Sequence, residues 1–316
     1  MFQDREGDRH VRLYGNEAIM GLRTIAQRRY SGLLRKMIRL GLARSKDPLA
    51  LFKQLSDELD HSNWGGGGRK REQPTVRAIF LDDLISNTIQ LYGRWEATEL
   101  DLLSRVVFSR LPKSSTAIDV GANIGNHANH FARHFDRVLA FEPDPMIAHV
   151  LSANAIYQSR MAGENQERVQ VFPYALREQA GQCGYRVHDD HNLGGSGIVD
   201  DDDASFQIEI KTLDSVISDL GVTDVTFIKC DVEGWEGQVF AGARELLTQS
   251  DPIIAFEASF GIDLPAQERG QFVEELLLLL NYSYFFEPTP RLTLQRIPTL
   301  VGTDRPMVIV SKFDLN

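Results

Sequence analysis

Three short apolar segments of this chain each end in a carboxylate. Asp119 lies near the end of residues 115–120, Glu142 follows residues 137–141, and Asp231 ends residues 225–231. Such segments have the length of buried strands, and parallel strands bring their carboxyl ends to one edge of a sheet. We therefore expect the three acids to face one crevice. Carboxylates in a crevice can bind hydroxyl or ammonium groups and can accept a proton.

A glycine turn separates the first two segments, and residues 119–125 read D-V-G-A-N-I-G. The dinucleotide fingerprint G-x-G-x-x-G would need glycine at positions 121, 123 and 126, but two of these are asparagine. The spacing D-x-G-x-x-x-G fits S-adenosylmethionine instead, with Gly121 and Gly125 forming the turn. Asp119 is then the candidate for the cofactor's ammonium group, and Glu142 for both ribose hydroxyls. An ordinary strand–turn–helix connection in another doubly wound protein is the alternative.

A second group of charged residues occurs around the third segment. Lys229 and Asp231 are two residues apart and share one face of a strand, while Glu233 precedes the next helix. Glu257 ends the next predicted strand, which begins at residue 253, and is expected to face the same cleft. Buried charges are costly unless they are paired or used. A structural ion pair with helix capping is the alternative to a catalytic role.

The remaining pattern alternates predicted strands with helices and indicates an α/β fold with a mostly parallel sheet. We expect helices at 126–135, from 232 to about 247, and up to about 280. Further strands are expected at 169–174, 206–210, 282–286 and 307–311. The polar stretch at 188–203, with two histidines at 188 and 191, is more simply a solvated loop than a set of metal ligands.

Composition separates the N-terminal part from the rest. Residues 1–50 carry eleven Lys and Arg against five Asp and Glu, although the whole chain has a net charge of −10. Apolar residues recur there at helical spacing, and Gly65 to Gly68 indicate a flexible connector. We therefore predict an N-terminal helical extension with its linker at 1–74 and a catalytic domain at 75–316. The basic residues on the other faces of these helices most simply form a solvated face, and a contact with an acidic membrane surface or a partner protein is the alternative. The amphipathic helices also make self-association through this segment reasonable.

The acidic balance argues against nucleic-acid binding. Three features of the sequence favour a cytoplasmic location for the protein. The two cysteines lack C-x-x-C spacing, the N-terminus has no apolar signal core, and no segment is long enough to span a membrane.

Five segments together resemble the FkbM family of S-adenosylmethionine-dependent methyltransferases, in order and spacing, from about residue 80 to 312. They are D-V-G-A-N-I-G at 119–125, F-E-P at 141–143, T-L-D at 212–214, I-K-C-D-V-E-G at 228–234 and G-A at 242–243. The resemblance implies a Rossmann-like class I methyltransferase fold and O-methylation of sugars or natural-product hydroxyls. By position it implies cofactor roles for four residues: Asp119, Gly121, Asn123 and Glu142. Cys230 and Arg177 depart from the family pattern, and residues 1–70 lie outside it.

Several neighbouring residues complete the predicted site. Tyr174 and Ala175 are expected to flank the adenine, and Pro143 follows Glu142. Glu96 is expected to close over the methionine end of the cofactor, with helix capping as its alternative role. A packed core ring is the alternative for Tyr174. The predicted cofactor residues are thus Glu96, Asp119, Gly121, Asn123, Gly125, Glu142, Pro143, Tyr174 and Ala175.

Methyl transfer to a hydroxyl needs in-line geometry and a group that accepts the proton. The candidate catalytic residues are Asp231, Glu257, Lys229 and Glu233, and His127 is a weaker candidate. A divalent metal ion beside Asp231 stays an alternative, but the sequence shows no complete ligand set, and no metal ligand is assigned. The leading hypothesis is O-methylation of a saccharide or secondary-metabolite hydroxyl. A non-catalytic cofactor-binding module and an NAD-dependent oxidoreductase are the alternatives.

Overall fold

The computed structural model describes residues 76, 78–80, 83–163, 167–187, 196–199, 204–259, 264–289, 291–302 and 304–316. The chain divides into two compact units, Met1–Arg71 and Glu72–Asn316, and every described residue belongs to the second. The predicted N-terminal helices and their linker lie outside the described residues. So do the histidines of the polar stretch at 188–203.

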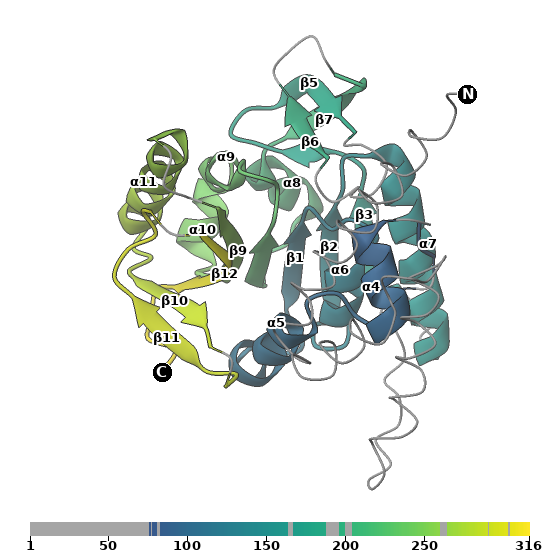
Figure 1. Ribbon diagram of the computed structural model, residues 1–316, viewed down its shortest axis with the longest axis horizontal. Coiled ribbons are helices and arrows are strands. Elements are labelled where there is room, and N and C mark those ends of the chain that lie inside the picture. The colour runs from purple at the N-terminus through teal and green to yellow at the C-terminus, as the bar shows by residue number, and fades with distance from the viewer. Residues whose placement is uncertain are drawn as a thin grey trace, which may run out of the picture. The chain divides into compact units, whose positions relative to one another are not determined.

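An eight-stranded sheet forms the centre of the unit Glu72–Asn316, in the order β11-β10-β12-β9-β8-β1-β2-β3 (Figure 1). Its strands are β1 (Thr116–Val120), β2 (Arg137–Phe141), β3 (Val169–Phe172), β8 (Val225–Cys230), β9 (Ile253–Ser259), β10 (Tyr284–Pro288), β11 (Leu294–Ile297) and β12 (Asp304–Ser311). The neighbours from β9 to β3 pair in parallel, whereas β12 is antiparallel to both β9 and β10. The predicted α/β fold with a mostly parallel sheet is confirmed.

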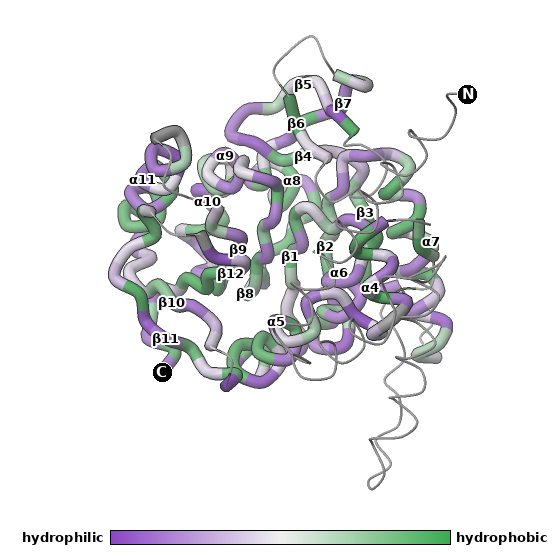
Figure 2. The backbone as a smooth tube through the Cα atoms, viewed as in Figure 1, coloured by the Kyte–Doolittle hydropathy of each residue, from purple (hydrophilic) through white to green (hydrophobic). Residues whose placement is uncertain are grey.

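Helices cover both faces of this sheet. They are α4 (Leu84–Tyr92), α5 (Ala97–Leu102), α6 (Asn126–Phe131), α7 (Pro145–Ala162), α8 (Leu213–Leu220), α9 (Glu236–Ala241), α10 (Arg244–Gln249) and α11 (Leu264–Leu279). Successive residues of a strand point to opposite faces, so Ala117 of β1 joins the core under α5, α6 and α7, while Ile118 joins the core under α8 to α11. Figure 2 shows the resulting concentration of hydrophobic residues in the central strands.

A smaller sheet lies beyond the carboxyl end of β3 (Figure 1). Its order is β4-β7-β5-β6, with β4 (Ala175–Leu176), β5 (Gly181–Arg186), β6 (Gly197–Val199) and β7 (Phe206–Lys211). The sequence predicts only the strand at 206–210. The strands β4 and β6 are too short to show a periodic pattern, and β5 contains two glycines that weaken its strand signal.

The prediction of one continuous helix from 232 to 247 is wrong. The structure has two helices there, α9 and α10, with Gly242 between them. A Cβ on Gly242 would lie 2.2 Å from the carbonyl oxygen of Arg177, so this main chain can approach only a glycine. The G-A segment at 242–243 therefore marks a close contact between the helix break and the chain that follows β4.

Candidate active site

A cavity of about 620 Å³, part of it open to solvent, lies at the carboxyl ends of β1, β2 and β8. Six residues predicted for the cofactor line it: Gly121, Asn123, Glu142, Pro143, Tyr174 and Ala175. Two of the predicted catalytic residues, Asp231 and Glu233, line it as well.

Glu142 directly follows β2 and is buried at the pocket wall. Its Oε2 accepts a hydrogen bond from the backbone N–H of Asn123 at 3.0 Å, and its Oε1 accepts one from that of Asp144 at 2.9 Å. Burial raises the pKa of Glu142 to about 7, although the two backbone bonds oppose the shift. The carboxyl group is thus held in one orientation, with lone pairs left over for a ligand.

The wall beside Glu142 is aromatic. Phe141 stacks on Phe172 with ring centroids 4.9 Å apart, and Tyr174 packs against both rings. Phe141 and Tyr174 line the pocket, and Ile147 adds an aliphatic surface. A flat apolar ligand group fits such a wall.

The glycine turn is shaped by a contact within the protein. Gly121 has a φ of +77°, and a Cβ at this position would lie 1.8 Å from the carbonyl oxygen of Asp231. Gly125 has a φ of +89°, and a Cβ there would lie 2.4 Å from Leu151. Gly121 therefore lets the loop after β1 approach the loop after β8, and Gly125 lets α6 begin against α7.

Asp119 lies beneath the pocket and does not line it. In the sheet it is level with Lys229 of β8, and both residues point to the face covered by α5 and α6. Asp119 is fully buried, and neither of its carboxylate oxygens has a hydrogen-bond partner among the described residues. Burial raises its pKa, although the charge of Lys229 opposes the shift.

Lys229 forms an ion pair with Asp231, and its Nζ lies 2.9 Å from Oδ2 of the acid. The side chain of Lys229 is 6% exposed and that of Asp231 is 32% exposed. Burial alone would lower the pKa of Lys229, but the charges of Asp231 and Asp119 raise it overall. Burial would raise the pKa of Asp231, but the ion pair outweighs it and holds this pKa below its ordinary value. Asp231 is therefore ionised at neutral pH.

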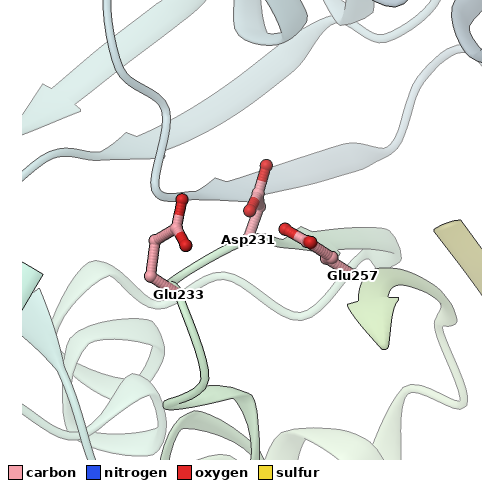
Figure 3. A group of neighbouring side chains, drawn as sticks. All are labelled: Asp231, Glu233 and Glu257. Carbon is pink, nitrogen blue, oxygen red and sulfur yellow. The ribbon is translucent and has the colours of Figure 1, made fainter. Parts of the chain in front are cut away.

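Two further acids meet Asp231 at the edge of the pocket (Figure 3). One carboxylate oxygen from each of Asp231, Glu233 and Glu257 lies within 4.8 Å of the other two. Glu257 lies within β9, which continues to Ser259 and not only to the predicted end at Glu257. Its carboxylate accepts a hydrogen bond from the Ser259 hydroxyl at 2.6 Å. Glu233 is an exposed residue, but partial desolvation of its carboxylate and the charges of Asp231 and Glu257 raise its pKa to about 7. Burial and the charge of Asp231 also raise the pKa of Glu257.

Glu236 shapes the loop that carries these acids. Its Oε1 accepts hydrogen bonds from the backbone N–H groups of Val232 at 3.1 Å and Gly234 at 3.2 Å. Glu233 has a φ of +55° in this loop, a conformation that non-glycine residues seldom adopt. The side chain of Glu236 thus holds Glu233 in place from the start of α9.

Glu96 also lies outside the pocket lining. It precedes α5 with a φ of +49° and makes no side-chain cap. Its Oε2 lies 3.2 Å from Nε2 of His127, close enough for an ion pair but without hydrogen-bond geometry. The charge of Glu96 acts on Lys229 and Glu257, so it belongs to the charged group beneath the pocket.

Sequence reasoning missed two aromatic residues of the pocket, Tyr185 and Trp235. The guanidinium of Arg177 lies 4.0 Å from the centroid of the Trp235 ring, which fixes that ring by a cation–π contact. Trp235 directly follows the I-K-C-D-V-E-G segment, so its position was a usable signal. Tyr185 comes from β5 of the small sheet, and nothing local in the sequence marked it.

The sheet order, the antiparallel strand beside β9 and a pocket at the strand ends define a class I methyltransferase fold. Residues 119–286 match the model of the methyltransferase FkbM domain, which is more than half of the chain. The chain belongs to this family, and the methyltransferase class that the sequence predicts is confirmed.

Two curated relatives are similar over part of their length. The 2-O-methyltransferase NoeI of Sinorhizobium fredii (strain NBRC 101917 / NGR234) is 26% identical over 170 residues, which cover 46% of this chain and 65% of the relative. The methyltransferase sdnD of Sordaria araneosa is 24% identical over 176 residues, which cover 43% of this chain and 63% of the relative. The chain thus spans less than two thirds of the length of these relatives.

Solved structures are similar at lower identity. The methyltransferase FkbM from Methylobacillus flagellatus KT is 19% identical, with a TM-score of 0.41 over 71% of this chain and 52% of that one. A putative methyltransferase from Streptococcus mutans in complex with SAH is 11% identical, with a TM-score of 0.37 over 68% of this chain and 96% of that one.

In the part of the chain that the structure describes, none of the helices has the length and hydropathy needed to cross a membrane.

Proposed function

We propose that this chain is an S-adenosylmethionine-dependent O-methyltransferase that acts on a hydroxyl of a saccharide or secondary metabolite. One observation carries the proposal: Glu142 at the end of β2 and Asp231 at the end of β8 line the same pocket. The first acid suits a ribose, and the second suits a hydroxyl that gives up a proton. The relative NoeI, described as a 2-O-methyltransferase, supports oxygen as the methylated atom.

The pocket residues fit the adenosine part of the cofactor. Glu142 is fixed by two backbone N–H groups and can accept hydrogen bonds from both ribose hydroxyls. The aromatic wall of Phe141 and Tyr174 suits the adenine. When bound, the cofactor supplies an electrophilic methyl group on a sulfonium. The buried Asp119 would act on its ammonium only at a distance, because Asp119 lies beneath the pocket.

We assign a different role to each of the three acids at the pocket edge. Asp231 is ionised through its pair with Lys229, so it can accept a hydrogen bond from the acceptor hydroxyl and orient it. A catalytic base works best when its pKa lies near the working pH. Glu233, whose pKa is about 7, matches that condition, and we assign it as the group that takes the proton. Glu257 positions Asp231 from β9.

The test is an acceptor screen that measures released S-adenosylhomocysteine, with and without a chelator. With an active acceptor, Glu233→Gln is expected to lower kcat by about 10²-fold or more and to remove the ionisation near pH 7. Asp231→Asn is expected to raise KM and lower kcat together, because the hydroxyl loses its orienting partner. Glu268→Gln, which removes an exposed acid from α11, is the matched control. If Glu233→Gln and Asp231→Asn both turn over like this control, the assignment of the acids is wrong.

The same measurements separate the alternative functions. A non-catalytic module would bind S-adenosylmethionine in a calorimetric titration and release no S-adenosylhomocysteine with any acceptor. An NAD-dependent oxidoreductase would bind NAD instead. A loss of activity with the chelator would favour a metal ion at the three acids of Figure 3.

Five points of the sequence analysis stay predictions. They are the helical extension at 1–74, the domain at 75–316, self-association through the N-terminal helices, the exclusion of nucleic acid and the cytoplasmic location.

A further inference from the structure

The small sheet supplies part of the wall of the active-site pocket. Tyr185 of β5 and two residues of β6, Gly197 and Ile198, line this pocket together with Glu142 of the main sheet. Figure 1 shows the small sheet beyond the carboxyl ends of the main strands, where a ligand of the pocket would lie. Side chains of β5 and β6 can therefore touch the same ligand as Glu142.

Tyr185 is held in place by both neighbouring strands. It pairs with Ile198 of β6 and with Phe206 of β7, and cross-strand partners share one face of a sheet. Its ring stacks on that of Phe206 with centroids 5.3 Å apart, and its carbonyl accepts a hydrogen bond from the N–H of Ser205 at 2.7 Å. The ring therefore has its position before a ligand arrives.

The hydroxyl group of Tyr185 is not used within the protein. In the described part of the chain no group forms a hydrogen bond with its Oη, although the residue is only 4% exposed. The Oη still keeps surface that solvent can reach. Because Tyr185 lines the pocket, a ligand there can meet this surface, and the phenolic O–H can donate a hydrogen bond to it.

The charges around Tyr185 indicate which part of the pocket the hydroxyl group faces. Burial, followed by the negative charges of Glu142, Asp144 and Glu233, raises the pKa of Tyr185 above its ordinary value. The group therefore keeps its proton at any working pH and stays a donor. Since the charge of Glu142 acts more strongly than that of Glu233, the hydroxyl lies on the Glu142 side of the pocket.

A ribose held by Glu142 needs a donor of this kind. Each ribose hydroxyl that donates to a carboxylate keeps lone pairs that can accept a further hydrogen bond. Within the described lining there is no Lys or Arg to supply that donor. A neutral O–H next to Glu142 is thus the complement of the carboxylate.

We propose that Tyr185 is a further cofactor-binding residue, whose O–H donates to the oxygen of a ribose hydroxyl held by Glu142. This rests on the proposed function, since it takes S-adenosylmethionine as the cofactor. The small sheet then takes part in recognising the sugar of the cofactor, and β5 brings the donor to the acid that follows β2.

The test is calorimetry on the full chain with three probes: S-adenosylhomocysteine, its 2′-deoxy analogue and its 3′-deoxy analogue. Tyr185→Phe removes only the hydroxyl and keeps the ring that stacks on Phe206. It is expected to lower the affinity for S-adenosylhomocysteine by about threefold to tenfold, as the loss of one neutral hydrogen bond does. For one of the two deoxy analogues, the variant and the wild type should bind equally, because the oxygen that accepts from Tyr185 is then absent.

Tyr284→Phe is the matched control. Tyr284 also stacks on a phenylalanine, Phe286 of the same strand, with ring centroids 6.5 Å apart, but it does not line the pocket. This variant is expected to bind all three probes as the wild type does, with the same melting temperature as Tyr185→Phe to within a few degrees.

Two results would overturn the inference. One is equal affinity of Tyr185→Phe and Tyr284→Phe for S-adenosylhomocysteine. The other is the same loss of affinity in Tyr185→Phe for all three probes, because a general disturbance of the pocket would act on each of them alike. If the wild type binds no S-adenosylhomocysteine, the proposed function itself fails. Binding by the wild type without an effect of Tyr185→Phe removes only the role of Tyr185.

Discussion

A Cβ atom on Gly121 would lie 1.8 Å from the carbonyl oxygen of Asp231. The glycine turn after β1 and the acidic loop after β8 are therefore in direct main-chain contact. This contact couples the shape of the predicted cofactor loop to the position of the acid that we assign to the acceptor. A side chain at position 121 must displace one loop or the other.

Gly121→Ala is expected to lower the free energy of unfolding by several kcal/mol, since it adds a backbone clash to the strain of a φ of +77°. Gly163→Ala is the matched control, because Gly163 also has a positive φ, +71°, but has nothing within 4 Å of the added Cβ. Urea denaturation measures both. Equal losses of stability in the two variants would show that the contact with Asp231 does not matter.

Cofactor affinity is expected to depend on pH through Glu142, whose pKa burial raises to about 7. Below that pH the carboxyl group holds a proton and loses acceptor capacity for the ribose hydroxyls. The affinity for S-adenosylhomocysteine should therefore rise about tenfold from pH 6 to pH 8. Glu142→Gln should bind more weakly and lose this part of the pH dependence. A pH profile of the variant parallel to that of the wild type would contradict this role.

Glu236 is expected to make the fold less stable as the pH rises. It is 2% exposed, and burial raises its pKa to about 7 in the native state from an ordinary value of 4.5. The native state binds this proton more tightly than the unfolded state does. The stabilisation is thus complete below about pH 4.5 and is lost as the pH passes through about 7, by up to about 3 kcal/mol.

Glu236→Gln keeps an oxygen that can accept from Val232 and Gly234 but cannot ionise. Its free energy of unfolding should therefore fall less than that of the wild type between pH 4.5 and 7.5. Denaturation at a series of pH values measures the difference, with Glu268→Gln as the control. Equal slopes in all three proteins would show that the native pKa of Glu236 is not raised.

Asp214, in the T-L-D segment, is expected to cap the start of α10, although it lies about 30 residues earlier in the sequence. Its two carboxylate oxygens accept hydrogen bonds from the N–H groups of Glu245 at 3.0 Å and Leu246 at 2.9 Å. Asp214→Ala should cost about 1–2 kcal/mol, as the loss of a helix cap does. Asp219→Ala, an exposed acid on the same helix α8, is the control. Thermal unfolding of the two variants checks the cap, which is absent if both melt alike.

Local patterns were sufficient for much of the sheet. Residues 137–141 were predicted as a strand with its observed bounds, and 225–231 ran only one residue too far, because each is a short apolar run bounded by polar residues. The acids near their ends could be placed at one edge because parallel strands leave no other arrangement. The small sheet escaped prediction since β4, β5 and β6 are short and partly glycine-rich, and are held by pairing between distant segments.

The sequence by itself determined the family, the parallel sheet and the identity of several pocket residues, because these depend on apolar runs, glycine turns and the spacing of acids. Only the tertiary structure decided that Asp119 and Glu96 lie outside the pocket, that Gly121 serves a contact with Asp231, and that Tyr185 reaches the site from another sheet. Such features depend on which side chains meet across segments far apart in the chain, and no local pattern records those distances.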